Sequence, residues 1–467
     1  MKLTFHGGVN EIGGNKILVE DKDTRIFLDF GKSYKEAGKY FEEFLQPRAY
    51  HGIHDFLSLG LIPKMEGIYR ADFLNILKEE NNLPFALHKN PSVDGLLLSH
   101  GHMDHTADIS FLDERIPVYT SGETKSVVEA FSVVRPANLE NEIVGFRTRG
   151  LGHKNTTTKQ RDIRAVMPGQ SFKIKDLEIT PYAVDHSVPG AMMFLIKTSA
   201  GNLLYSGDFR LYGDKEELVR ESLKEIAKEG VDIFLCEGTR IKSETKISEK
   251  EVYEEAYDLI KGATGLVATD YSIADISRFA TLKKLATQVK RSFAIPANNY
   301  YYLNHLRENQ LLPFDLDNVL IYHRLKTVYS EWEKKLLERN KDICVVGPEE
   351  ISKAQNRYLL GLGFYQIQEL IDLKPEKGSM FFRASTEPHS EEMAISEERF
   401  NNWIHLFGMS DPIRAHASGH ISGIELAEVM KIIKPKLVIP IHTEYPEEFN
   451  KIAKNVKLVE KGVEYEF

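Results

Sequence analysis

Cysteine is scarce in this sequence: only Cys236 and Cys344 occur among 467 residues. Both lie in apolar stretches, which excludes a disulfide-stapled secreted scaffold and favours buried thiols in a reducing cytoplasm. Long apolar runs are missing as well, so no segment is predicted to span a membrane. A basic excess is also lacking, because the net charge is −9. That balance argues against a protein that coats nucleic acid non-specifically, although bound dications could still hold phosphates on an acidic protein.

What the sequence does contain is a dense set of metal-ligand side chains. Residues 96–105 read LLLSHGHMDH, in which three leucines run into His100, His102, Asp104 and His105. The leucines predict a buried strand that opens into a loop. Because side chains alternate along a strand, His100 and His102 can face one point, while Asp104 and His105 face a second. One such histidine is usually an ordinary surface residue, but four ligands in six residues favour two metal ions.

Further polar groups follow other predicted strands. They are His186 after PYAVD, Asp208 after LLYSG and His442 after KLVIPI. One allocation gives a first ion to His100, His102 and His186, and a second to Asp104, His105 and His442, with Asp208 as the bridge. A ligand set without cysteine suits two Zn²⁺ ions, with Mn²⁺ as the alternative.

Asp29 also ends a predicted strand, in RIFLDFG. The residue is either a turn residue beside Gly31 or a carboxylate that orients a ligating histidine. The pattern alone favours neither interpretation, so both stay open.

The chain changes character twice. Residues 1–214 read mainly as short strands, with an irregular insertion at 32–93. Its His51, His54 and His88 lack ligand spacing and are interpreted as structural. Residues 215–378 alternate helices with short apolar strands, which is typical of a parallel α/β unit. Residues 379–467 return to the sequence pattern of residues 1–214. We therefore expect an α/β protein whose first domain, formed by 1–214 and 379–467, is interrupted by a second.

Several motifs carry a resemblance to a known family. HGHMDH resembles the signature of the metallo-β-lactamase fold, and Asp29, His186 and Asp208 match its other motifs in the expected order. Three further segments resemble the β-CASP branch of that superfamily: FLCEGTR around Glu237, ASGH around His420 and PIHTEY around His442. Within the branch, GGVNEIGGNK, VDHSVPGA, SGDFR and KPKLVIPIH resemble the ribonuclease J group.

The resemblance implies a metallo-β-lactamase αββα sandwich with an inserted β-CASP α/β domain. It implies a zinc-dependent ribonuclease that hydrolyses single-stranded RNA with metal-activated water. The expected mode is 5′→3′ exonuclease activity, with endonuclease activity as an additional mode. His420 would supply charge or a proton at the leaving oxygen and would be held by Glu237, while Asp104 would accept a proton from the attacking water.

Other functions stay open at this point. A single-strand DNA nuclease of the same fold is the hardest to separate, because no residue can be named that reads the 2′-hydroxyl group. A small-molecule hydrolase is disfavoured by the inserted domain with Glu237 and His420. A non-catalytic RNA-binding partner is disfavoured because all seven ligands are present.

The sequence departs from the ribonuclease J pattern in two places. The last motif reads HTEYP, where that group has HGE followed by a basic residue. Ala274 and Asp275 fall where the group has a Ser-Asn pair that binds a 5′ phosphate, and a carboxylate there would repel phosphate. The requirement for a 5′-monophosphate is therefore open. The chain ends 25 residues after His442, so we expect no extra C-terminal domain and a monomer or weak dimer.

Candidate substrate contacts lie beside these motifs or on the inserted domain. Arginine and serine are good phosphate partners, but an ordinary surface role is equally compatible with each residue. The candidates are His416, Ser418, Ser385, Arg240, Arg278 and Arg383.

Overall fold

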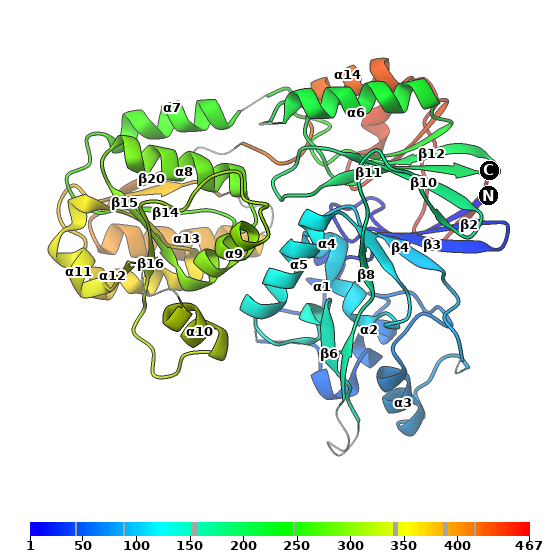
Figure 1. Cartoon of the computed structure of the whole chain (residues 1–467), viewed down its shortest axis with the longest axis horizontal. Helices are drawn as coiled ribbons and strands as arrows, with labels where there is room; N and C mark the ends of the chain where they lie inside the picture. Colours follow the sequence, from blue (N-terminus) through cyan, green and yellow to red (C-terminus); the bar gives the residue numbers. More distant parts are fainter. Residues whose placement is uncertain are drawn as a thin grey trace. The chain divides into compact units, whose positions relative to one another are not determined.

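The chain divides into two compact units in the computed structural model (Figure 1). The structure describes residues 1–42, 44–86, 89–150, 157–213, 215–245, 248–339, 344–385, 391–414 and 417–467. Unit 1 comprises Met1–Thr245 and Gly419–Phe467, and unit 2 comprises Lys246–Ser418. Unit 1 is therefore built from two stretches of chain that are far apart in the sequence.

Two mixed sheets form the centre of unit 1. The first has the order β22-β1-β2-β3-β4-β5-β8 and the second the order β21-β13-β12-β11-β10-β9. The first sheet consists of β1 (Lys2–Gly7), β2 (Lys16–Asp21), β3 (Thr24–Leu28), β4 (Gly95–Leu97), β5 (Val118–Thr120), β8 (Ile163–Ala165) and β22 (Glu464–Glu466). The second consists of β9 (Phe172–Ile174), β10 (Leu177–Ala183), β11 (Met192–Thr198), β12 (Gly201–Tyr205), β13 (Ile233–Glu237) and β21 (Leu437–Ile441). A separate pair joins β6 (Gly145–Arg147) and β7 (Thr158–Gln160).

Alternating side chains explain why the two sheets pack face to face. On β11, Phe194 and Ile196 join a core cluster that also contains Leu97 of the first sheet. Met193 and Leu195 of the same strand point to the other side, into a cluster with helices. Successive residues of a strand face opposite sides of the sheet, so a strand that is apolar on both faces needs cover on both.

Helices supply that cover on the outer faces. The cluster outside the first sheet includes side chains of α2 (His54–Ser58), α3 (Ala71–Glu79) and α5 (Gly122–Val134). The second sheet is covered by α6 (Glu216–Glu229) and α14 (Gly423–Ile433), which lie side by side over it (Figure 1). Two sheets between two helical layers make the αββα sandwich that the resemblance implied, and that expectation is confirmed.

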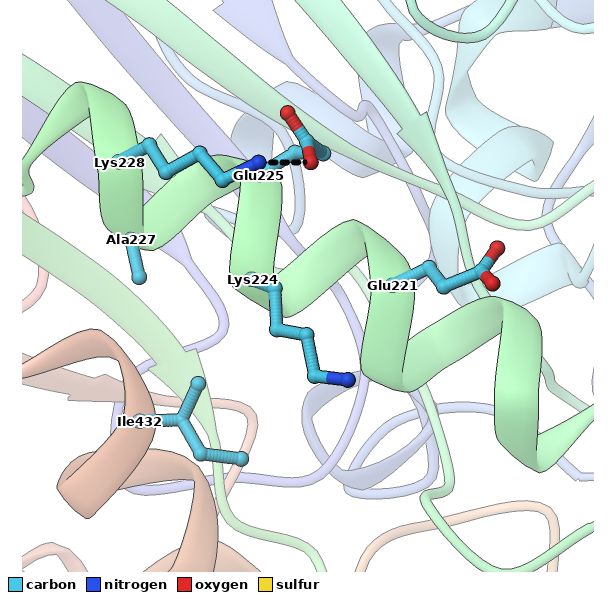
Figure 2. Close-up of a pocket in the computed structure, with 6 residues that line it drawn as sticks. All are labelled: Glu221, Lys224, Glu225, Ala227, Lys228 and Ile432. Carbon is cyan, nitrogen blue, oxygen red and sulfur yellow. Dashed lines mark hydrogen bonds and ion pairs between the residues drawn. The ribbon is translucent and has the colours of Figure 1, made fainter.

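The remaining helical segments of unit 1 are short. They are α1 (Tyr34–Ala37), α4 (Met103–Thr106) and the 3₁₀ turns η1 (Ala49–His51), η2 (Ala107–Phe111), η3 (Leu139–Asn141) and η6 (Pro446–Lys451). A shallow surface pocket between α6 and α14 is lined mainly by charged side chains and Ile432 (Figure 2). Lys228 in its wall is ion-paired with Glu225, and none of the candidate site residues lines it.

Unit 2 is organised around one parallel sheet with the order β17-β16-β15-β18-β14-β19-β20. Its strands are β14 (Val267–Asp270), β15 (Ser292–Pro296), β16 (Val319–Tyr322), β17 (Val345–Val346), β18 (Tyr358–Gly361), β19 (Met380–Arg383) and β20 (Ser410–Arg414). Its helices are α7 (Glu249–Ile260), α8 (Ile276–Gln288), α9 (Ala297–Glu308), α10 (Glu331–Arg339), α11 (Pro348–Lys353), α12 (Leu370–Leu373) and α13 (Glu391–Leu406), with 3₁₀ turns η4 (Gln355–Arg357) and η5 (Phe364–Glu369). The parallel α/β character expected for the inserted domain is present.

The limits of the units differ from those expected, 1–214, 215–378 and 379–467. Residues 215–245 belong to unit 1, because β13 lies between β12 and β21 and α6 packs against α14. Residues 379–418 belong to unit 2, because β19 pairs with β14 and β20 extends the same sheet. The pattern of predicted helices and strands changes near the expected limits, but it does not show which sheet each strand joins. Among the described residues, no helix combines the length and the hydropathy needed to cross a bilayer.

A buried ion pair in unit 2 gives a test of this packing. Arg278 has no exposed surface, and its Nη2 lies 3.0 Å from Glu249 Oε1. Because Glu249→Gln removes the charge that compensates a buried guanidinium, we expect a loss of about 3 kcal/mol of stability, measured as a lower unfolding midpoint in calorimetry. Glu349→Gln, whose side chain is 81% exposed and paired with Lys353, is the matched control and should change little. Equal midpoints for the two variants would contradict the assignment.

Candidate metal centre

The candidate ligands all follow the carboxyl ends of strands in unit 1. His100 comes after β4, His102 is the residue before α4, and α4 itself carries Asp104 and His105. The other three candidates follow strands of the second sheet: His186 after β10, Asp208 after β12 and His442 directly after β21. Strand ends are rigid supports, which suits side chains that must hold a fixed geometry.

Three imidazoles from this set converge on one point. His102 Nδ1 lies 3.1 Å from His100 Nε2 and 3.1 Å from His186 Nε2. These spacings are close to the ~3.3 Å between ligands of a tetrahedral zinc ion with bonds of about 2.0 Å. The three residues form the first of the groups able to hold a metal ion.

A second group contains Asp104, His105, Asp208 and His442. Asp104 Oδ2 lies 3.3 Å from His442 Nε2 and 3.7 Å from His105 Nε2. Asp208 reaches both groups, because its Oδ2 is 3.1 Å from His105 Nε2 and 3.6 Å from His100 Nε2. The structure therefore brings the seven candidates together in the two sets, with Asp208 between them.

Hydrogen bonds on the far side of each ring aim these nitrogens inward. His186 Nδ1 is 2.6 Å from the carbonyl oxygen of Gly419, to which it donates. His100 Nδ1 is 3.0 Å from Ser99 Oγ, and His442 Nδ1 is 2.8 Å from Thr239 Oγ1. An imidazole that donates from Nδ1 presents a lone pair at Nε2, which is the form that binds a metal.

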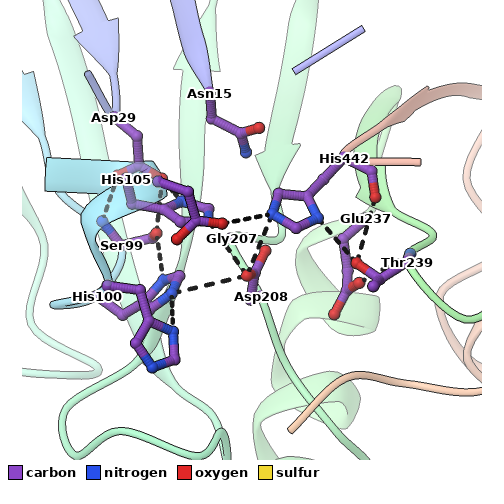
Figure 3. A network of polar contacts seen from close by, with 12 residues as sticks. Asn15, Asp29, Ser99, His100, His105, Gly207, Asp208, Glu237, Thr239 and His442 are labelled. Carbon is purple, nitrogen blue, oxygen red and sulfur yellow. Dashed lines mark hydrogen bonds and ion pairs between the residues drawn. The ribbon is translucent and has the colours of Figure 1, made fainter. Parts of the chain in front are cut away.

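Asp29 is the hub of this outer hydrogen-bond network (Figure 3). Its carboxylate accepts from the backbone N and the hydroxyl of Ser99, both at 2.7 Å, from His105 Nδ1 at 2.6 Å and from Tyr205 at 2.5 Å. Asp29 is fully buried and has φ +52°, in the left-handed region that is strained for a residue with a side chain. Of the two interpretations that the sequence left open, the geometry favours the orienting carboxylate.

Gly31 allows α4 to approach this hub closely. A Cβ atom at Gly31 would lie 1.8 Å from the carbonyl oxygen of Asp104. The flanking residues bind the same turn, because Phe30 N donates to the carbonyl oxygen of His105 and Lys32 N to that of Met103. Only glycine fits between the two backbones here.

His420 and Glu237 lie beside the second group. His420 Nδ1 is 3.3 Å from Glu237 Oε1 and 3.7 Å from Asp208 Oδ2. Glu237 is fully buried at the end of β13 and accepts hydrogen bonds from the backbone N of Phe209 and of Thr239. The His420 side chain remains 22% exposed, so a fixed buried carboxylate holds an imidazole that solvent can reach.

Burial disfavours the charged form of the three imidazoles in the first group. Burial and the imidazolium of His105 keep the pKa of His100 well below its usual value. Burial also lowers the pKa of His186 and takes that of His102 to about 4. Three neutral imidazoles whose lone pairs face one another repel unless a cation lies among them.

The second group is rich in carboxylate. Burial opposes the charge of His105 and of His420, but nearby carboxylates outweigh it. Asp208 and Asp104 raise the pKa of His105, while Glu237 and Asp208 raise that of His420 to about 9. Asp208 Oδ1 is buried without a hydrogen-bond partner, which is costly for a carboxylate oxygen. The donor set, the facing lone pairs and this orphaned oxygen all fit divalent cations.

The substrate contacts of Arg240, in unit 1, and of Ser418, the last residue of unit 2, stay predictions. Arg240 Nη2 donates to Ser243 Oγ at 2.8 Å and to Thr245 Oγ1 at 3.1 Å, so its guanidinium holds the loop that follows β13. Ser418 is partly exposed and directly precedes Gly419, the hydrogen-bond acceptor of His186. His416 lies outside the described residues.

The remaining candidates use their polar groups inside unit 2. Arg278 binds Glu249 and the carbonyl oxygen of Ala384. Asp270 accepts from Arg383 Nε at 2.7 Å and from Ser385 Oγ at 2.6 Å. These contacts argue against phosphate binding by the three side chains, because their donors already satisfy buried carboxylates.

Asp275, the departure noted in the sequence, caps α8. Its carboxylate accepts from the backbone N of Arg278 at 2.9 Å. Aspartate is among the preferred residues at this position of a helix. Capping of α8 is therefore a sufficient reason for an aspartate at position 275.

The sequence reasoning did not single out Ser99, Tyr205 or Thr239. Ser99 and Tyr205 bind Asp29, and Thr239 binds His442. In the sequence, Ser99 and Thr239 could be identified only by their position next to a motif. Ser99 directly precedes His100, and Thr239 lies two residues after Glu237. Nothing local marked Tyr205, which reaches Asp29 from a strand 176 residues away.

Comparison with known proteins places these features in a family. Residues 72–263 match the model of a beta-lactamase superfamily domain, and residues 412–462 match that of a Zn-dependent metallo-hydrolase RNA specificity domain. Ribonuclease J 2 of Streptococcus pyogenes is 24% identical over 99% of this chain and 72% of its own. Ribonuclease J of Pyrococcus abyssi is 23% identical over 95% of this chain and 90% of its own.

A solved structure supports the fold. The crystal structure of a protein of unknown function from Enterococcus faecalis V583 aligns over 99% of both chains, with a TM-score of 0.74 and 22% identity. Fold and matches together define a metallo-β-lactamase domain interrupted by a β-CASP domain. The chain is a ribonuclease J-like member of the β-CASP branch of the metallo-β-lactamase superfamily.

The role of Asp29 can be tested by Asp29→Asn. In this variant an amide NH₂ group replaces one of the two carboxylate oxygens that accept hydrogen bonds from Ser99, His105 and Tyr205. A donor then faces a donor inside the protein, so we expect a loss of about 3 kcal/mol of stability. Because His105 and Ser99 lose their fixed orientation, zinc retention in competition with a chelator should fall ~10–100-fold. Asp162→Asn is the matched control, since its side chain is 46% exposed and ion-paired with Arg164. Unchanged zinc retention in Asp29→Asn would refute the orienting role.

Proposed function

We propose that this protein is a metal-dependent ribonuclease that hydrolyses phosphodiester bonds in single-stranded RNA. The observation that carries the proposal is the His420–Glu237 pair beside a seven-ligand cluster. His420 and His442 both lie in the segment that matches an RNA specificity domain. A cytoplasmic location and a monomeric or weakly dimeric state stay predictions.

Two Zn²⁺ ions are proposed as the cofactors, with Mn²⁺ as the alternative. His100, His102 and His186 would hold one ion, and Asp104, His105 and His442 the other, with Asp208 shared. Ions held there would acidify the attacking water and stabilise negative charge on the phosphate oxygens. Asp29, Ser99, Thr239 and the Gly419 carbonyl group keep the rings oriented, so the protein does not need to rearrange as charge develops.

His420 and Asp104 are the proposed proton-handling groups. The partly exposed edge of His420 faces solvent, while Glu237 stabilises its charged form, so it can donate a proton to the leaving oxygen. The Asp104 side chain is 21% exposed, and its carboxylate can accept a proton from the attacking water. Hydrolysis with loss of the 3′ oxygen leaves a 5′-phosphate on the product.

The mode of digestion is proposed from the family. The relatives named above are ribonucleases J, and 5′→3′ exonuclease activity with additional endonuclease activity is the expected pattern. A single-strand DNA nuclease is the alternative to test alongside, because none of the described side chains is assigned to the 2′-hydroxyl group.

The test uses single-stranded RNA labelled at the 5′ or the 3′ end, with matching DNA, in the presence of Zn²⁺ or Mn²⁺. The wild type should release labelled mononucleotide at once from the 5′-labelled RNA. Asp104→Ala should lose at least ~10³-fold in rate, because one residue supplies both a ligand and a proton acceptor. His420→Ala should lose ~10²–10⁴-fold while retaining its metal.

Matched controls are Asp162→Ala and His405→Ala, which change exposed residues that are not among the candidate site residues and should cleave at the wild-type rate. Internal fragments in place of mononucleotides would assign an endonuclease. Equal cleavage of DNA would assign a general single-strand nuclease. Failure of the metal-loaded wild type to cut any strand would overturn the proposal and favour a small-molecule hydrolase.

A further inference from the structure

A third group of metal-ligand side chains lies in the insertion of unit 1, apart from the seven candidates already described. It consists of His51 at the end of η1, His54 at the start of α2 and Glu80 directly after α3. One possible ligand atom of each residue lies within 4.8 Å of the others. The sequence pattern had favoured ordinary structural histidines here, because the 25 residues between His54 and Glu80 hide the cluster.

Glu80 faces both imidazoles with its two oxygens. Glu80 Oε1 lies 2.7 Å from His51 Nδ1, and Glu80 Oε2 lies 4.0 Å from His54 Nδ1. The two rings are close, with centroids 5.9 Å apart and an interplanar angle of 69°. Three possible metal-ligand atoms, on three separate segments of the chain, thus lie close together.

Two of these atoms are left without a hydrogen bond. His54 Nδ1 and Glu80 Oε2 are both buried from solvent at the atomic level, and neither has a hydrogen-bond partner. A buried acceptor and a buried ring nitrogen that face each other at 4.0 Å are too far apart to satisfy each other directly. A cation between them would satisfy both. The side chains of His51, His54 and Glu80 are 20%, 26% and 14% exposed, which leaves a route for a solvent ligand.

The neighbouring carboxylate is not a fourth donor. Asp55 accepts from the backbone N of Arg48 at 2.9 Å and from its Nε at 3.1 Å. Both oxygens are thereby used by the arginine. The donor set is two imidazoles and one carboxylate, a combination that suits Zn²⁺ with water in the remaining position.

We propose that His51, His54 and Glu80 form an additional zinc site that links the segments of the insertion. The ion joins His51 to Glu80 across 29 residues, and closing a loop of this length restricts the unfolded chain. The linked segments also carry Phe56 and Phe73, which pack in the same core cluster as Leu96 and Leu98. The site therefore fastens the insertion to the strand that precedes the HGHMDH motif, and it does not depend on the proposed nuclease activity.

The test compares zinc content of the full chain and its variants after dialysis against a buffered low zinc concentration. His51→Gln/His54→Gln should hold one zinc fewer per chain than the wild type. His323→Gln/His405→Gln, two histidines of unit 2 outside every candidate group among the described residues, is the matched control and should lose none. The readout is the difference between proteins, so it stays valid whatever number of ions the seven-ligand centre binds.

A second variant guards against a folding defect. Glu80→Gln keeps the shape of the side chain and should weaken binding of this one zinc on the order of tenfold or more, because a carboxylate ligand becomes a neutral amide. Added Zn²⁺ should raise the unfolding midpoint of the wild type more than that of Glu80→Gln. Initial RNA cleavage rates should match the wild type in both site variants.

Equal zinc content and equal zinc-dependent midpoints in wild type, His51→Gln/His54→Gln and Glu80→Gln would overturn the proposal. In that case the two unpartnered atoms are bridged by water. If the wild type does not cleave RNA, that result contradicts the proposed function and leaves the proposal of this zinc site unchanged.

Discussion

The buried carboxylate of Asp29 is the contact on which the geometry of the metal centre depends. It accepts from Ser99, His105 and Tyr205, and Ser99 in turn lies 3.0 Å from His100 Nδ1. One anion thus fixes a ligand in each of the two groups and ties the two sheets together, because Tyr205 belongs to the second sheet and Ser99 follows a strand of the first. A buried charge is stable only when its hydrogen-bonding capacity is met, so the four donors select one arrangement of these segments.

That arrangement is held against local backbone strain. Asp29 and His442 both adopt left-handed φ values, +52° and +50°, at the points where their strands end. Each such residue costs of order 1–3 kcal/mol, and the cost is offset by charged hydrogen bonds worth about 1.5–3 kcal/mol each. The left-handed turn lets a strand stop abruptly and present its next side chain at the sheet edge. Strain at these two positions is therefore part of how the ligands are placed.

The sequence predicted the parts of this centre that depend on local pattern. Ligands after apolar strands can be recognised because the strand supplies direction and burial, and His100 to His105 show this most clearly. Thr239 and Tyr205 could not be found in that way, since their roles depend on a partner brought close by the fold. The same reason explains the domain limits: β13 looks like any short apolar strand, and only its pairing with β12 and β21 assigns it to unit 1.

Arginine shows the limit of sequence reasoning most sharply. Arg240, Arg278 and Arg383 were all candidates for phosphate contact, and each has donors committed to neighbouring residues. In a chain with a net charge of −9, attraction of a polyanion then gains little from Arg278 and Arg383, whose donors satisfy buried carboxylates, while a contact by Arg240 stays a prediction. At the proposed reaction point, His420 and the divalent cations that the seven ligands would hold supply positive charge. Substrate affinity and catalysis would consequently share one source of charge, so loss of metal should weaken RNA binding as well as cleavage.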